Sequence, residues 1–361
     1  MRFTERTGLV GGRPPDRYLW TDAFAVCNFL GLGEMELALQ LVDQVHRILG
    51  QHAAGHPLGG WLSGFERQRA GAHPTAGGLR IGKKLPERRA SEPFDDRLEW
   101  ERDGQYFHYL TKWMHALDQV ARWTRRPTFN VWARELAVAA HHAFSYVPTG
   151  EAVGRRRMYW KMSVDLSRPL VASMGHHDPL DGYITCMQLQ ATADRLGAAN
   201  EGPGLAEEAA SFAAMITSDL STTDPLGLGG LLADAWRVEQ LMNDGAIEGR
   251  VLRDRLLDAA LAGLDGYQPG GEWSSPASHR LAFRELGMAI GLAAVPLIGA
   301  AGEAASQVEL LARFLPLRSE IEDFWLRPDH RTTASWLAHQ DINEVMLATS
   351  LVPWGYLSIR S

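Results

Sequence analysis

Hydrophobic residues recur mainly three and four positions apart along most of the chain, whereas strict alternation of hydrophobic and polar residues is scarce. This spacing places apolar side chains on one face of a helix, so the pattern predicts a nearly all-helical protein. Helices are expected at about residues 21–31, 34–50, 105–123, 128–146, 163–175, 179–196, 204–221, 227–243, 247–264, 279–295, 302–317 and 341–352. These twelve helices would form six helical hairpins.

Turn and capping residues support several of these helix ends. Gly31 and Gly33 separate the first two helices, and Pro127 interrupts the chain between the third and the fourth. Asp341, followed by Glu344 three residues later, has the spacing of a capping box. Most connections are short enough to join antiparallel neighbours.

The segments that precede alternate helices share a second pattern, because most of them carry tryptophan, tyrosine or histidine. They are residues 17–20, 105–108, 159–162, 227–230, 273–279 and 336–339, and only 227–230 has no aromatic or basic side chain. If alternate helices form an inner ring, these segments converge on one mouth lined with aromatic rings and imidazoles, which suits a sugar. A closed toroid formed by a single domain, residues 1–361, is favoured over a solenoid because the hairpin lengths show no fixed repeat period.

One connection, at about residues 50–104, is far longer than the others. A long irregular segment inside a compact domain is usually either functional or disordered, and Trp61 and Trp100 argue against disorder. We interpret this insertion as a rim loop or lid over the mouth.

Within the insertion, residues 77–84 come close to the pattern of a phosphate-binding loop. Lys84 replaces the required serine or threonine, and a proline follows shortly after it. Nucleotide binding is therefore not indicated. The side chains of Arg80, Lys83 and Lys84 could still contact a phosphate or carboxylate group on a sugar.

The charge and cysteine content narrow the classes of protein further. The 361 residues include 36 Lys and Arg and 43 Asp and Glu, which gives a net charge of −7 and disfavours a nucleic-acid partner. Cys27 and Cys186 lie in apolar helical runs and are expected to be free, buried thiols of a cytoplasmic protein. The first residues lack an apolar signal core, and the longest apolar run, residues 286–301, is too short to cross a membrane and is expected to be a buried helix.

Residues 17–25 read Arg-Tyr-Leu-Trp-Thr-Asp-Ala-Phe-Ala. This segment resembles the first helix of the N-acylglucosamine 2-epimerase family, whose relatives include the cellobiose epimerases and mannose isomerases and in which an arginine shortly precedes a tryptophan. Three further stretches, residues 106–124, 162–174 and 336–347, are similar to the second, third and last inner helices of that family. The likeness spans most of the chain, and the order of the motifs carries it.

The resemblance implies an (α/α)6 barrel, in agreement with the six hairpins counted from the hydrophobic pattern. It also implies proton transfer at the carbon beside an opened sugar carbonyl, with two histidines as base and acid and an arginine that holds oxygen atoms. Carried over by position, Arg17 would bind the substrate, and His339 would be the catalytic histidine at the N-terminus of the last inner helix. A homodimer is compatible with this likeness, and no cofactor is implied.

The chain departs from the family at its other catalytic histidine. That residue belongs to a Gly-His-x-x-Glu pattern on the eighth helix, and the matching stretch here has Gly230 in place of the histidine and Ala233 in place of the glutamate. Asp234 is one position away, which rotates it by about 100° around a helix and off the required face. The second proton-transfer group must therefore come from elsewhere, or the protein does not epimerise sugars.

Other residues could supply the missing group. His279 and Glu285 lie on the predicted tenth helix and, with His339, complete the candidate catalytic set, although His279 could equally belong to a capped helix start. His108 heads a polar stripe on the third helix that faces either the lumen or the solvent. The candidate substrate-binding residues are Arg17, Trp20, Trp61, Tyr106, His108, Asp165, Arg280 and Trp336.

Two other functions stay open. Asp165 and Glu285 are candidates for the carboxylate pair of a glycoside hydrolase or a lyase, and the missing histidine motif fits a non-catalytic toroid that binds carbohydrate or protein. The pairs His141-His142 and His176-His177 point about 100° apart on a helix, so a metal site is not expected. The partner we expect is a sugar or sugar derivative, without a cofactor, a nucleic acid or a membrane.

Overall fold

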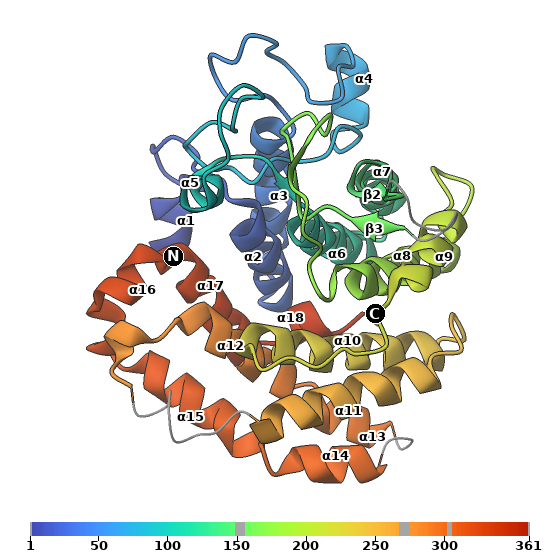
Figure 1. Ribbon diagram of the computed structural model, residues 1–361, viewed down its shortest axis with the longest axis vertical. Coiled ribbons are helices and arrows are strands. Elements are labelled where there is room, and N and C mark those ends of the chain that lie inside the picture. The colour runs from blue at the N-terminus through green and yellow to red at the C-terminus, as the bar shows by residue number, and fades with distance from the viewer. Residues whose placement is uncertain (1, 149–155, 267–274, 302–304, 360–361) are drawn as a thin grey trace. The chain divides into compact units, whose positions relative to one another are not determined.

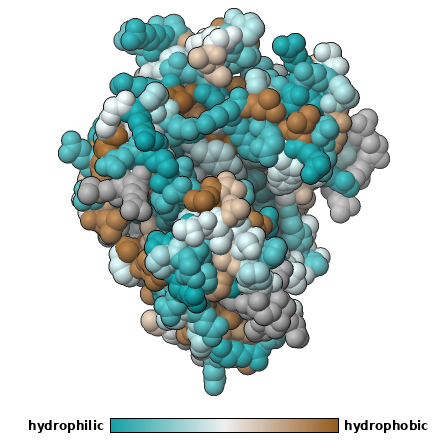
Figure 2. All heavy atoms as spheres, turned by 90° about the vertical axis from the view of Figure 1, so that its left-hand side faces the viewer, coloured by the Kyte–Doolittle hydropathy of each residue, from teal (hydrophilic) through white to brown (hydrophobic). Residues whose placement is uncertain are grey.

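The computed structural model describes residues 2–148, 156–266, 275–301 and 305–359. Helices contain 61% of the chain and strands 4%, so the predicted all-α class is confirmed. The chain divides into two compact units, unit 1 at Met1–Ile216 and unit 2 at Thr217–Ser361 (Figure 1). On the face in Figure 2, hydrophobic residues form separate patches among hydrophilic ones.

Unit 1 contains two rows of helices. After the short α1 (Arg2–Arg6), the inner row consists of α2 (Leu19–Gly31), α6 (Phe107–Thr124) and α8 (Asp178–Arg195), with α6 packed against both of the others (Figure 1). The outer row consists of α3 (Met35–Leu49) on α2, α7 (Pro127–Phe144) on α6 and α9 (Ala206–Met215) on α8. The segments at 17–20 and 105–108 lie at the starts of α2 and α6, as predicted, whereas the segment at 159–162 leads into a strand and not into a helix.

Burial explains why the two rows differ in sequence. The inner helix α2 is buried on nearly all sides, whereas the outer helix α3 is amphipathic and buries Leu41, Val45 and Leu49. A buried polar network joins α6, α7 and α8 at Asp118. Its carboxylate accepts hydrogen bonds from Arg122 (2.8 Å) and from three further side chains, those of Asn130, Gln188 and Thr192. A buried carboxylate satisfied in this way fixes the register of three helices.

The insertion at residues 50–104 is ordered and contains α4 (Arg67–Ala72) and α5 (Asp96–Glu101). Arg80 is buried and donates to Asp103 Oδ2 at 2.8 Å and to two backbone carbonyls. Asp103 Oδ1 in turn accepts the backbone N–H groups of Gly82 (3.0 Å) and Lys83 (3.2 Å). The donors that resemble a phosphate-binding loop are thus used within the protein, and Arg80 anchors the insertion.

A small three-stranded sheet lies beside the helices of unit 1. The strand β4 (Lys161–Met162) pairs antiparallel with β1 (Gln105–Tyr106) and with β5 (Pro169–Val171), and β2 (Ser145–Tyr146) pairs separately with β3 (Arg157–Met158).

The helix predicted at residues 163–175 is therefore wrong. Asp165 lies in the turn between β4 and β5, where its Oδ1 accepts from the hydroxyls of Ser163 (2.6 Å) and Ser167 (2.7 Å). Short polar side chains that hydrogen-bond locally compete with a helix, and Pro169 follows at once.

Unit 2 is built around α10 (Pro225–Asn243), α12 (Ala282–Leu292) and α17 (Gln340–Leu351), with α12 between the other two. The helix α11 (Arg250–Gly266) packs on α10, and α15 (Leu315–Leu326) packs on α12 and α17. The shorter elements are α13 (Val295–Ala300), α14 (Ala305–Ala312), α16 (Ala334–Ala338), α18 (Trp354–Leu357) and the 3-10 turns η1 (Ala277–His279) and η2 (His330–Thr332).

Glycines set the distance between α10 and α12. A Cβ atom on Gly229 would lie 2.0 Å from the backbone oxygen of Gly287, and one on Gly291 would lie 2.4 Å from that of Gly229. By contrast, nothing lies within 4 Å of a Cβ on Gly230, which is exposed. The absence of aromatic side chains from residues 227–230, in the first turns of α10, is thus explained in part by close contact between two helix backbones.

Three other expectations can be compared with the structure, two in unit 2 and one in unit 1. The predicted helix at 302–317 is divided into α14 and the start of α15, and the rest of α15 was not predicted. Of the described residues, only the segment Ala282–Ala300 is long and apolar enough to cross a membrane, and 72% of its apolar window is buried within the protein. This agrees with the buried helix expected at 286–301. Cys27 and Cys186 are both buried and free, as expected.

Candidate functional site

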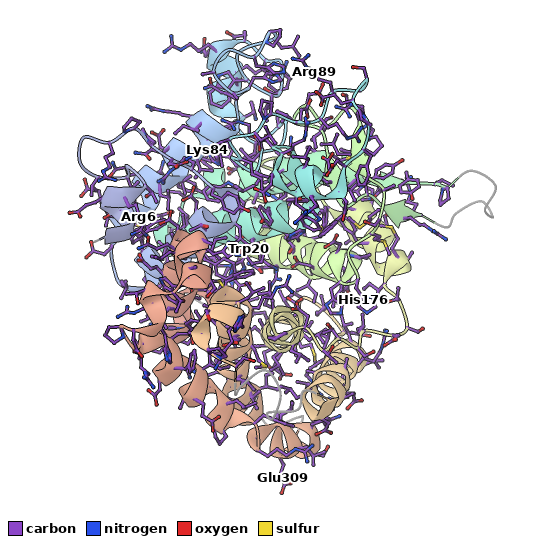
Figure 3. The ribbon with its side chains drawn as sticks, turned by 60° about the vertical axis from the view of Figure 1, so that its left-hand side comes forward. Arg6, Trp20, Lys84, Arg89, His176 and Glu309 are labelled. Atoms are coloured by element: carbon purple, nitrogen blue, oxygen red, sulfur yellow. The ribbon has the colours of Figure 1, made fainter. Side chains whose placement is uncertain are left out.

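Aromatic side chains gather where the N-terminal ends of α2 and α6 meet in unit 1. The ring of Trp20 lies 5.9 Å from that of His108 and 5.3 Å from that of Tyr109, measured between centroids. Tyr106 lies 5.4 Å from His108 and 5.7 Å from Trp160, and the rings of His108 and Trp160 are stacked at 6.1 Å. Figure 3 marks Trp20 among these helices. We call Trp20, Tyr106, His108, Tyr109 and Trp160 the aromatic cluster.

Helix periodicity places charged groups next to this cluster. Lys112 follows His108 by four residues on α6, so both side chains share one face of the helix. The ammonium group of Lys112 donates to Asp181 Oδ2 at 2.9 Å, and Thr111 donates to the same oxygen. Asp181 belongs to the first turn of α8, so this ion pair joins α6 to α8.

Asp178 is the second carboxylate in the first turn of α8. It is buried, and its Oδ2 has no hydrogen-bond partner among the described residues. Burial and the negative charge of Asp181 raise the pKa of Asp178 to about 7, although a backbone hydrogen bond at Gly175 and the charge of Lys112 act in the opposite direction. A carboxyl group with such a pKa exchanges protons at neutral pH.

The surroundings of His108 lower its pKa, whereas those of Asp178 raise the pKa of that carboxyl group. Burial and the positive charge of Lys112 lower the pKa of His108 to about 4, against a smaller contribution from Asp181. The imidazole is therefore uncharged at neutral pH. Burial also raises the pKa of the phenols of Tyr106 and Tyr109, so these groups remain protonated and can hydrogen-bond to a ligand.

Three of the predicted substrate-binding residues, Trp20, Tyr106 and His108, come together in this cluster. The side chain of Arg17 is engaged elsewhere in unit 1, since it donates to the backbone oxygen of Thr7 at 2.6 Å and lies 3.5 Å from the carboxylate of Asp22. Its guanidinium is buried and ties the N-terminal segment to α2.

Two further predicted residues of unit 1 also lie outside the aromatic cluster. Trp61 lines a separate pocket between the insertion and the outer helices. Asp165 is exposed in its turn; burial would raise its pKa, but hydrogen bonds from Ser163 and Ser167 outweigh this and lower it.

In unit 2, Arg280 and Glu285 form a buried ion pair. The guanidinium of Arg280 donates to both carboxylate oxygens, at 2.8 and 2.6 Å, and Trp325 donates to Glu285 Oε2 at 2.7 Å. The ring of Trp336 lies 5.5 Å from that of Trp325. Both oxygens of Glu285 are thus occupied by partners that close packing holds in place.

The two predicted histidines of unit 2 are both exposed. His279 ends the turn η1, and His339 precedes α17, with its ring 5.6 Å from that of Phe283. His339 therefore lies at a helix N-terminus, as predicted, but the proposed cap at Asp341 is wrong because α17 already begins at Gln340. Trp273 lies outside the described residues.

Sequence reasoning missed Asp178 and Asp181 as site residues. Their spacing of three in the first turn of a predicted helix places them on one face, and this signal was present in the sequence. The neighbouring His176 lies on the loop before α8 (Figure 3). Within the described residues, no group of three or more His, Cys, Asp or Glu side chains is placed to hold a metal ion.

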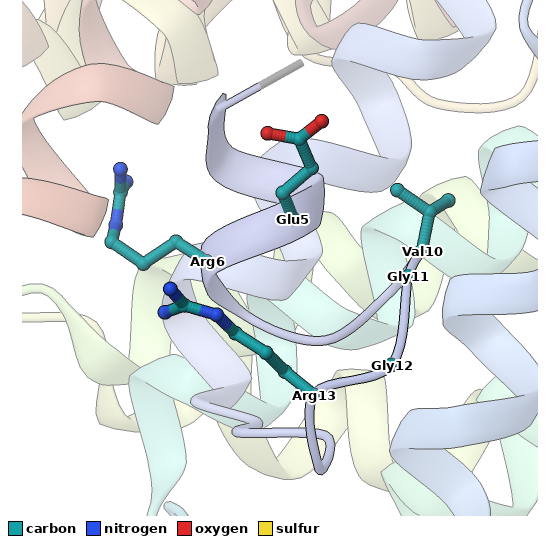
Figure 4. A pocket seen from close by; sticks show the side chains of 6 residues that line it. All are labelled: Glu5, Arg6, Val10, Gly11, Gly12 and Arg13. Carbon is teal, nitrogen blue, oxygen red and sulfur yellow. The ribbon is translucent and has the colours of Figure 1, made fainter.

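A hollow of about 500 Å³ at the N-terminal segment is a weaker candidate (Figure 4). It is lined by Glu5, Arg6, Val10 and the loop that follows, and the guanidinium groups of Arg6 and Arg13 extend to the same side. Arg13 and the two glycines before it are exposed, so the hollow offers no rigid wall for a ligand.

Comparison with models of protein families, with curated proteins and with solved structures gives no match for this chain. The likeness to the 2-epimerase family therefore stays a prediction that depends on the motifs in the sequence. The function of the aromatic cluster and of Asp178 can therefore be inferred only from the geometry and charges of these residues.

Proposed function

We propose that this protein is a cytoplasmic sugar isomerase or epimerase that moves a proton at the carbon beside an opened sugar carbonyl. The observation that carries the proposal is the buried Asp178 carboxyl group, whose pKa is about 7 and is influenced by both members of the Lys112–Asp181 ion pair. Lys112 also lowers the pKa of His108, which belongs to the aromatic cluster. A pKa near the working pH is what a general acid-base group requires.

In this proposal, Asp178 as a carboxylate removes the proton from C2 of the open-chain sugar. The electron pair of the broken C–H bond forms a double bond to C1, and the carbonyl oxygen becomes an enolate oxygen. Lys112 stabilises this negative charge, and the neutral His108 donates a hydrogen bond to it. For the ketose, the proton returns to C1, the C2 hydroxyl gives up its proton and becomes the new carbonyl, and O1 takes up a proton to become a hydroxyl. For the epimer, the proton returns to the opposite face of C2 and the C1 carbonyl re-forms.

The aromatic cluster would supply binding rather than chemistry. The flat faces of Trp20 and Trp160 bury the C–H surface of a sugar, while the phenols of Tyr106 and Tyr109 hydrogen-bond to its hydroxyl groups. This assignment retains the predicted roles of Trp20, Tyr106 and His108. It moves the proton-transfer step from the missing Gly-His-x-x-Glu histidine to Asp178.

We also propose that the chain is a divergent relative of the 2-epimerase family with one (α/α)6 barrel. Each unit contributes three helices suited to an inner ring, namely α2, α6 and α8 in unit 1 and α10, α12 and α17 in unit 2. Six is the number that such a barrel requires. On the family likeness alone, His339 stays a proposed catalytic histidine of unit 2, at the position before α17.

The test is deuterium exchange at C2 of mannose, glucose and N-acetylglucosamine in deuterated water, followed by NMR. We expect exchange with at least one sugar, and Asp178→Asn should slow it by about 100-fold or more. Asp194→Asn is the matched control, because Asp194 is an exposed carboxylate on the same helix. Absence of exchange with all three sugars would contradict the proposal.

A glycoside hydrolase is the second candidate, and one observation favours it. Asp178 and Asp181 are two carboxylates on one face of α8, one with a raised pKa and the other paired with Lys112, as an acid and a base or nucleophile require. Release of nitrophenol from nitrophenyl glycosides, without C2 exchange of free sugars, would select this function.

A further inference from the structure

A second pocket in unit 1 shares no residue with the aromatic cluster. It has a volume of about 340 Å³ and lies between α3, the N-terminal end of α7 and the insertion. Its size is near the lower end of the range for small-molecule sites, which is roughly 300–1,000 Å³. We call it the α3–α7 pocket.

His46 of α3 is the buried polar residue of this pocket, with 4% of its surface exposed. Its Nε2 accepts a hydrogen bond from the indole N–H of Trp113 at 3.2 Å. An indole nitrogen can only donate, so Nε2 must be the unprotonated nitrogen. Burial lowers the pKa of His46 to about 3, so the ring is neutral and its single proton is on Nδ1.

The Nδ1–H group of His46 has no acceptor. Among the described residues, no hydrogen-bond partner lies within reach of this atom, and it is not one of the unpaired side-chain atoms sealed from solvent. His46 forms part of the pocket wall, so the pocket provides this access. An unpaired donor in an otherwise buried side chain is costly unless a ligand or water accepts from it.

The rest of the wall combines aromatic rings with charged groups, of which Asp43 and Arg47 neutralise each other in an ion pair at 3.0 Å. Trp61, Phe129 and Trp132 line the pocket, and the ring of Trp132 lies 5.1 Å from that of His46. The guanidinium of Arg126 lies over Phe129 at 4.8 Å and is exposed. In the described part of the chain it has no carboxylate partner, so it can accept an anionic group of a ligand.

We propose that the α3–α7 pocket binds a small aromatic acid whose ring carries a phenolic hydroxyl group in addition to the carboxylate. The aromatic ring of the ligand lies among Trp61, Phe129 and Trp132. Its phenolic oxygen accepts the Nδ1–H of His46, and its carboxylate pairs with Arg126. This ligand uses the aromatic surface, the unpaired donor and the unpaired cation together. A neutral sugar has no anionic group to pair with Arg126.

The test compares three probes on the full chain by calorimetry, namely 4-hydroxybenzoate, benzoate and phenol. We expect 4-hydroxybenzoate to bind best, benzoate to bind several-fold more weakly because it leaves the His46 donor unpaired, and phenol to bind about tenfold more weakly because it lacks the charge. Arg126→Met should weaken 4-hydroxybenzoate about tenfold and leave phenol unchanged. Arg125→Met is the control, since Arg125 is also exposed but does not line the pocket.

Nitrogen NMR of histidine-labelled protein tests which nitrogen of His46 carries the proton, without any substitution. The His46 ring should show a proton on Nδ1, and 4-hydroxybenzoate should shift that resonance. A proton on Nε2 would overturn the inference, as would no binding of 4-hydroxybenzoate at millimolar concentration. Equal effects of Arg126→Met and Arg125→Met would overturn it as well.

Discussion

Replacing Asp178 with asparagine should make the protein more stable at alkaline pH, the opposite of what removal of a charged group usually does. The pKa of Asp178 is raised in the folded protein from an ordinary value of 3.8 to about 7, because burial and Asp181 penalise the charged form. Each pKa unit corresponds to about 1.4 kcal/mol, so the folded protein carries a penalty of roughly 4 kcal/mol once this carboxyl group is fully ionised.

The sign follows from the two pKa values. A group whose pKa is higher in the folded than in the unfolded state stabilises the fold at low pH, and this contribution is lost as the pH rises through the interval from about 4 to about 7. Asparagine has nearly the same shape and does not ionise. Between about pH 5 and pH 8, the free energy of unfolding of the wild type should therefore fall by about 2.5 kcal/mol relative to Asp178→Asn.

Urea unfolding of both proteins at the two pH values, followed by circular dichroism and tryptophan fluorescence, measures this difference. Comparison at each pH removes the contributions of all other titrating groups. Asp194→Asn should show no such dependence, because Asp194 is exposed on the same helix. A difference between wild type and Asp178→Asn that is constant with pH, or that grows in favour of the wild type, would refute the reasoning.

Two further predictions concern unit 2. Gly229→Ala should destabilise the protein by about 1–3 kcal/mol because its Cβ would collide with the backbone of α12, whereas Gly230→Ala, with open space around it, should stabilise by about 0.5–1 kcal/mol. Urea unfolding of the two variants should give opposite signs, and equal signs would contradict the packing argument. Glu285→Ala should cost about 3–5 kcal/mol, since it leaves Arg280 buried without its carboxylate. Thermal unfolding checks this, and lost C2 exchange with unchanged stability would instead support a catalytic Glu285.

Much of the helical framework could be predicted from the sequence because helix formation depends on local spacing. The amphipathic pattern of α3 and the proline at the start of α7 are local signals, and both helices lie where they were expected. The error at residues 163–175 is also local in origin. There, Asp165 and its neighbouring serines satisfy one another in a turn between two strands, and this competes with the helix that the apolar spacing suggested.

The candidate site, like the fold, could be predicted from the sequence only in part. The position of Trp20, Tyr106 and His108 at the starts of two predicted helices predicted that they could lie together, and in unit 1 their rings form one cluster. The hydrogen bond from Arg17 to the backbone oxygen of Thr7 could not be predicted, because it forms only once the N-terminal segment has folded back.

The sequence by itself determined the all-α class, the order of most helices, and the positions of Trp20, Tyr106 and His108 at the starts of α2 and α6, since these depend on periods of three to four residues and on turn chemistry. Only the tertiary structure decided the electrostatics. It buried Asp178 next to Asp181, joined Glu285 to Arg280, and fixed the proton of His46 through Trp113. Burial arises from contacts between separate elements, and the pKa of Asp178 depends on that burial more than on Asp181, its neighbour in the chain.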